Sequence, residues 1–165
     1  MLTTAPELKI KSLLLTNWNP ANTSNVTPKI HTGWYNHSWG STCQLTITDP
    51  NDSVMRGGET GITAFSGLGT LKRFVFSDMI VAPWASREMT DDNGNSFDSA
   101  GINPKSLVEE MSQEVKRIID ANRFSDSEVE YFAWLNKMRG VEHRLKPTVF
   151  RENNMVRVAY WEDAS

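Results

Sequence analysis

Residues 104–122 constrain the fold more than any other segment, because they form a helix that has to bury one face. Four apolar side chains recur along it at helical spacing: Leu107, Met111, Val115 and Ile118. Asn103 can cap this helix, with Pro104 at its first position, or Ser106 can cap it, with Glu109 closing a capping box. A stripe of this kind gains free energy only by leaving water, so we expect the helix to pack against a sheet.

Several other segments alternate in polarity and predict strands. The longest covers residues 71–88, where both faces are partly apolar, which is typical of a central strand. Pro83 indicates an edge or a bulge near its end. Residues 125–140 fit a helix or a strand, and their β-branched and aromatic content favours a strand. Shorter strands are predicted at residues 29–35, 43–48 and 155–161.

This order of elements predicts one α+β domain over residues 1–165, with an antiparallel sheet. A short N-terminal helix is expected over residues 8–18, ending before Asn19-Pro20. Residues 49–70 and 89–103 are rich in turn-forming residues and predict two extended polar loops, the second a mobile loop or inserted arm. The glycines of the first loop lack the Gly-Lys-Ser/Thr ending of a phosphate-binding loop.

The charge of the chain argues against nucleic-acid recognition. The net charge is −3 and the pI about 5.6, whereas proteins that grip phosphates carry a basic patch. Cys43 is the only cysteine, so no disulfide can form within one chain, and a small buried hydrophobe is the expected role. The N-terminal residues lack the pattern of a signal or membrane segment.

Catalytic and metal-binding patterns are weak. His31, His37 and Cys43 are spaced by six residues each, which does not match the tight local pairs of a zinc site. Asp91 and Asp92 lie among turn residues, where turn formation explains them. No Gly-x-Ser-x-Gly sequence occurs. We therefore expect no catalytic residue, metal or cofactor.

Two sets of apolar residues are candidates for contact with a partner. Trp34, Tyr35 and Trp39 lie within six residues, and they fit a core, a subunit interface or a platform for a ligand such as a sugar. The predicted loops also contain apolar residues with little reason to face water. We expect these to be buried at subunit contacts: Ile62, Phe65, Leu68 and Phe97.

The layout of residues 8–162 resembles that of small tail-completion or tail-terminator proteins. These belong to long-tailed viruses and proviruses of prokaryotes, including those found in archaeal genomes. The resemblance is one of layout and includes no catalytic signature. It is carried by Leu13-Leu14-Leu15, residues 17–23, Pro28-Lys29-Ile30, Thr32-Gly33-Trp34-Tyr35, residues 81–85, Asn103-Pro104, residues 114–119 and Val149-Phe150-Arg151.

The resemblance implies a structural protein without enzymatic activity. Such proteins are α+β folds that close into a ring, commonly a hexamer, at the head-proximal end of the tail tube. The implied partners are further copies of the chain, the tail tube protein and the head–tail connector protein. DNA would pass the lumen without specific binding. A role as connector or another tail component is the alternative within the virion, where the protein would lie near the neck after synthesis in the host cytoplasm.

Overall fold

The computed structural model describes residues 2–36, 39, 42–49, 59–65, 71–142 and 148–163, with the backbone alone at 59–65, 71 and 140–142. The helices are α1 (Pro6–Asn17), the 3-10 turn η1 (Pro20–Asn22) and α2 (Pro104–Ala121). The strands are β1 (Lys29–Thr32), β2 (Gln44–Thr48), β3 (Glu59–Phe65), β4 (Leu71–Ala85), β5 (Tyr131–Glu142) and β6 (Val149–Asp163). The expected α+β class, main helix and short N-terminal helix are confirmed.

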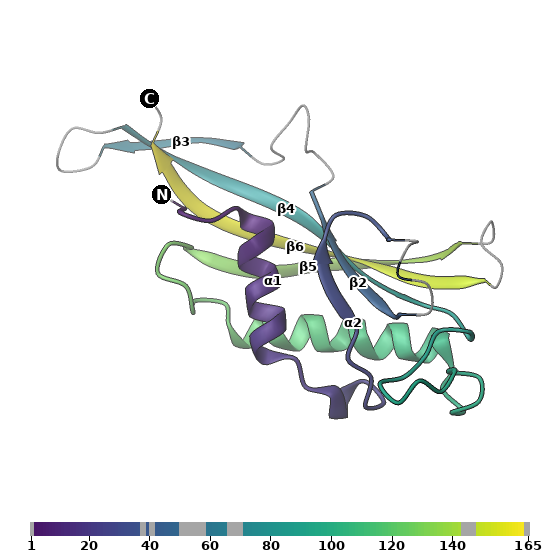
Figure 1. Cartoon of the computed structure of the whole chain (residues 1–165). Helices are drawn as coiled ribbons and strands as arrows, with labels where there is room; N and C mark the ends of the chain where they lie inside the picture. Colours follow the sequence, from purple (N-terminus) through teal and green to yellow (C-terminus); the bar gives the residue numbers. More distant parts are fainter. Residues whose placement is uncertain are drawn as a thin grey trace.

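The six strands form one mixed sheet in the order β1-β2-β4-β6-β5, with β3 paired to β4 outside this path (Figure 1). The prediction of a purely antiparallel sheet is wrong, because β1 and β2 run parallel. The two strands point the same way, so the chain has to return between them. The other pairs are antiparallel.

The long strand β4 is the centre of the sheet. β6 pairs with most of one edge of β4, while β3 and β2 share the other edge. Pro83 pairs with Leu45 of β2, and the register with β6 is the same before it, at Val81, and after it, at Trp84. The predicted edge or bulge at Pro83 is therefore wrong. The predicted loop at 49–70 also contains strand β3, whose seven residues extend the sheet.

Both helices lie on one face of the sheet, where they close the main core (Figure 1). The helix α2 begins at the first of the two predicted caps, because Asn103 Oδ1 accepts hydrogen bonds from the backbone N–H groups of Lys105 and Ser106 at 3.0 and 3.3 Å. Its stripe is fully buried, at about 1.5–3 kcal/mol for each large apolar side chain removed from water. Ile10 and Leu14 bring α1 into the same core.

Residues 89–103 fold back onto this body and do not form an arm. Met89 and Phe97 are 3% and 0% exposed, packed in one cluster with Leu107 and Met111 of α2. Backbone hydrogen bonds tie the two ends together, since Phe97 N–H donates to Met89 C=O at 2.7 Å. The predicted mobile loop is therefore wrong, and so is the placement of Phe97 at a subunit contact. The Phe97 ring is buried in the core of its own chain and has no surface left for another subunit.

A buried polar contact fixes the position of α2 on the sheet. Asn154 of β6 is fully buried, and its amide donates to Ser112 Oγ of α2 at 3.0 Å and to the Val81 carbonyl of β4 at 3.1 Å. Its Oδ1 accepts from Trp134 Nε1 of β5 at 3.1 Å. Three strands and one helix are thus joined through the side-chain amide of Asn154.

Within the described chain, no helix has the length and apolar character needed to cross a membrane.

Candidate interaction surface

The face of the sheet opposite the two helices carries an unusual set of side chains. Successive residues of a strand point to opposite faces, so Val75 and Met79 of β4 point to the helices while Phe74 and Phe76 point away. We call the side of β4, β5 and β6 that faces away from α1 and α2 the outer face. A sheet covered on one side normally carries polar residues on the other side. Here many of these positions are aromatic or aliphatic.

Four rings form one aromatic cluster at one end of the outer face: Phe74 and Phe76 of β4, Tyr131 of β5 and Trp161 of β6. The ring centroids of Phe74 and Trp161 are 4.9 Å apart, and those of Phe74 and Phe76 are 5.0 Å apart. Tyr131 lies 6.3 Å from Phe76. All four residues are half-buried, so each ring keeps part of its surface in contact with water.

A charged pair follows the aromatic cluster along the outer face. Arg157 Nε and Nη2 donate to the two carboxylate oxygens of Asp78, its partner across β4 and β6, at 2.8 and 3.0 Å. The guanidinium also lies 4.6 Å from the ring centroid of Phe76. The hydrogen bonds to Asp78 raise the pKa of Arg157 above its ordinary value, with a smaller contribution from Tyr131. This pair is therefore held as a fixed charged feature among apolar neighbours.

The outer face becomes aliphatic beyond the charged pair. Ile80 of β4 lies opposite Met155 of β6, and both are half-buried. On β5, Met138 lies opposite Asn153 and is 66% exposed. In the order along β4 and β6, the outer face thus has an aromatic part, a charged pair and an aliphatic part.

The predicted aromatic group Trp34, Tyr35 and Trp39 is only partly brought together. Trp34 and Tyr35 both pack on Trp84 of β4, with ring centroids 5.4 and 5.0 Å away. Trp39 instead lies against His31, at 4.4 Å. Tyr35 and Trp39 are half-buried, whereas Trp34 is 57% exposed. Trp34 is therefore the member of this group that offers most of its ring to a partner.

The predicted contact residues of the two loops are Ile62, Phe65, Leu68 and Phe97. Ile62 and Phe65 lie on β3, where the backbone alone is described, and Leu68 falls outside the described residues. The position of β3 beside β4 places Ile62 and Phe65 in the sheet and not in an open loop. Phe97 belongs to the core, as described above.

His31 and Cys43 have ordinary structural roles. His31 Nε2 lies 3.1 Å from Gln44 Oε1, and His37 falls outside the described residues. Cys43 is buried, its Sγ donates to the Trp84 carbonyl at 3.2 Å, and burial raises the pKa of its thiol to about 12. A thiol with this pKa is not a nucleophile at neutral pH. Among the described residues, no three acidic, histidine or cysteine side chains are placed to hold a metal ion.

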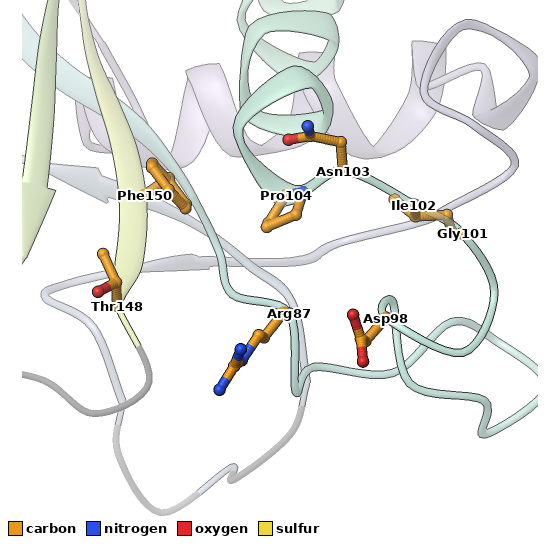
Figure 2. Close-up of a pocket in the computed structure, with 8 residues that line it drawn as sticks. All are labelled: Arg87, Asp98, Gly101, Ile102, Asn103, Pro104, Thr148 and Phe150. Carbon is orange, nitrogen blue, oxygen red and sulfur yellow. The ribbon is translucent and has the colours of Figure 1, made fainter.

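An open cleft of about 740 Å³ lies beside the first turn of α2. Figure 2 shows Asn103 and Pro104 on one side of this cleft, Phe150 and Thr148 on another, and Arg87 and Asp98 below them. Among the described residues, no hydrogen bond joins the Thr148 hydroxyl to a basic side chain, as nucleophilic catalysis would require.

The sequence indicates the outer face only indirectly. Phe74, Phe76 and Ile80 give the strand predicted at 71–88 a second apolar side, which is typical of a central strand. The structure places α1 and α2 on one face of this sheet, so the second apolar side of β4 is not covered by a helix.

No protein-family model matches the chain, and no curated protein matches its sequence at a significant level.

Proposed function

We propose that the chain is a structural assembly protein that works as a homo-oligomer and uses its outer face as a contact surface. One observation carries this proposal: the outer face places four aromatic rings and several aliphatic side chains where a monomer would carry polar ones. Large apolar patches on soluble proteins mark surfaces that meet another protein. Aromatic residues, Met and Arg are the residue types enriched in such contacts.

The packing of the rings favours a protein partner over a nucleic acid. Bases stack on ring faces that lie open, usually beside a basic groove. Here the ring planes of Phe74 and Phe76 meet at 79°, and Phe74 and Trp161 meet at 48°, so the rings cover part of one another. The nearest cation, Arg157, is paired with the carboxylate of Asp78. The net charge of −3 adds no attraction for phosphates.

The specific role that we propose is that of a ring-forming tail terminator at the head-proximal end of a viral tail tube. This role rests on the resemblance of layout to tail-completion proteins, together with an apolar contact surface of the kind that an oligomer needs. Its partners would be the tail tube protein and the head–tail connector protein, and its location the neck of a virion. A head–tail connector is the alternative role for the same assembly.

The mass of the purified protein in solution tests the proposal. We expect light scattering to give a multiple of the 18.6 kDa chain mass, and negative-stain images of this species to show a closed ring with a central hole. A hole wide enough for duplex DNA supports the tail role. A monomer at every concentration, both alone and mixed with tail tube protein, would contradict self-association.

A second candidate function is a ligand-binding module centred on Trp34. The observation in its favour is the 57% exposure of the Trp34 ring beside Trp84 and Arg151, whose guanidinium carbon lies 5.7 Å from the Trp34 ring centroid. A flat exposed ring suits the apolar face of a sugar. Acrylamide quenching of tryptophan emission, with and without oligosaccharides, tests it. Protection that is lost in Trp34→Ala would favour this function, and unchanged quenching would exclude the oligosaccharides tried.

A further inference from the structure

The outer face has an internal regularity that follows from the register of β4 and β6. Three cross-strand pairs lie along it in order: Phe74 with Trp161, Asp78 with Arg157, and Ile80 with Met155. The members of the first pair are both aromatic, and those of the last are both aliphatic. The members of the middle pair have opposite charges. Between the first two pairs, Phe76 lies opposite the small side chain of Ala159. Phe74, Asp78 and Ile80 of β4 therefore each have a chemically matching or complementary neighbour on β6.

This regularity makes the outer face complementary to itself in one orientation. A two-fold axis that runs parallel to the strands, midway between β4 and β6, places β4 of one copy over β6 of the other. Aromatic rings then meet aromatic rings, and aliphatic side chains meet aliphatic ones. Asp78 of each copy faces Arg157 of the other. The same two-fold axis therefore gives all three cross-strand pairs a favourable contact in the second copy.

The charges distinguish this orientation from the other face-to-face arrangement. A two-fold axis across the strands, through the charged pair, would place Asp78 over Asp78 and Arg157 over Arg157. Like charges brought together in an interface repel one another, so they would oppose that arrangement. Asp78 and Arg157 keep 22% and 28% of their side-chain surface exposed, which leaves both groups accessible to a second copy.

We propose that the outer face binds the same face of a second copy about a two-fold axis parallel to β4 and β6, with Asp78 of each copy opposite Arg157 of the other. The proposal rests on the proposed function, since it specifies the contact by which an assembly protein would associate. A two-fold contact closes on itself and gives a pair. A ring would need a second, head-to-tail contact in addition.

Exchanging the charges of residues 78 and 157 tests the contact between copies and keeps the ion pair within each chain. The variant Asp78→Arg with Arg157→Asp keeps an opposite-charge pair inside each chain, so it is expected to fold, and circular dichroism checks this. Two exchanged chains again place opposite charges together, so they should bind one another. An exchanged chain and a wild-type chain would place Asp opposite Asp and Arg opposite Arg, so they should not bind.

Native mass spectrometry of a mixture of the exchanged and wild-type chains, at equal concentrations, gives the readout. Pairs that form at random would be mixed in about half of all cases, the statistical share for a two-fold contact. We expect mixed pairs to fall at least about fivefold below this share, as like-charge contacts predict. A random share of mixed pairs, or an exchanged chain that folds but stays monomeric, would overturn the pairing.

A matched control exchanges an exposed pair on the helix side, Lys116→Asp with Asp120→Lys. This variant should mix with wild type at the random share. The outcomes also separate the two proposals. If the protein is an oligomer and its chains mix at random, the two-fold pairing is wrong but the proposed assembly function stands. If the wild type is a monomer, both proposals are wrong. Acrylamide quenching of Trp161 can be measured on the same samples with single-stranded DNA added. If the DNA protects Trp161 from quenching, the outer face binds a nucleic acid and not a second copy.

Discussion

Phe74 of β4 lies directly opposite Trp161 of β6, with ring centroids 4.9 Å apart, on the face of the sheet that neither helix covers. Cross-strand aromatic pairs stabilise a sheet by about 0.2–1 kcal/mol, a gain that smaller residues with high β propensity could partly replace. Trp161 and Phe74 also keep part of their surface in water. The proposed role in association would explain why two large aromatic side chains occupy these positions.

The core position of Phe97 gives a first prediction. Phe97→Ala removes a fully buried ring and should lower the free energy of unfolding by about 3–5 kcal/mol, the usual cost of this cavity. Urea unfolding followed by circular dichroism measures the change. The control is Phe124→Ala, because Phe124 is 74% exposed and should change stability by about 0.5 kcal/mol or less. Equal effects of the two substitutions would show that Phe97 is not in the core.

The shared amide of Asn154 gives a second prediction. Asn154→Ala leaves the Trp134 N–H and the Val81 carbonyl without their partner in a buried site. We expect a loss of about 2–3 kcal/mol in the free energy of unfolding, because buried polar groups left unpaired cost about 1–3 kcal/mol. The matched control is Asn136→Ala on the exposed side of β5, which should have little effect. A loss in Asn154→Ala no larger than that of the control would contradict this prediction.

Contacts of Glu128 with the N-terminal segment predict a dependence of stability on pH. Lys9 Nζ and the Thr3 hydroxyl donate to its carboxylate, at 2.6 and 2.9 Å. These hydrogen bonds lower the pKa of Glu128 from 4.5 to about 2. Because the pKa in the folded chain is below that of the unfolded chain, the stabilisation is complete above pH 4.5 and is lost as the pH falls toward 2.

Thermal unfolding over this pH range, for wild type and Glu128→Gln, measures that dependence. The unfolding midpoint of the wild type should fall more steeply with decreasing pH, so that the difference between the two proteins narrows as the pH approaches 2. Parallel curves for the two proteins would mean that Glu128 does not link α1 to the turn before β5.

The sequence predicted those elements whose periodicity extends over many residues. The apolar stripe of α2 and its Asn103 cap gave the helix, and the alternation of Val156, Val158 and Tyr160 gave the core side of β6. The sequence alone does not separate a strand from a helix at residues 125–140, because Ser125 and Glu128 also have the spacing of a helix cap. In the structure, Glu128 binds the N-terminal segment instead.

The features that the sequence did not predict depend on contacts between distant segments. Nothing in the alternation of β1 and β2 specifies that they run parallel. Phe97 is a single ring among turn residues, and its burial follows from the return of its loop onto Met111. The outer face required knowing that both helices cover the same side of the sheet, which periodicity alone does not give.

Sedimentation velocity of an outer-face variant tests the central claim most directly. Phe74→Thr with Trp161→Thr keeps residues that suit strands but removes both rings, and Phe124→Thr removes an exposed ring that is not part of the aromatic cluster. We expect wild type and Phe124→Thr to sediment as the same oligomer, and the double variant to sediment as a folded monomer. An oligomer that survives in the double variant, or that is lost equally in Phe124→Thr, would contradict the role of the outer face.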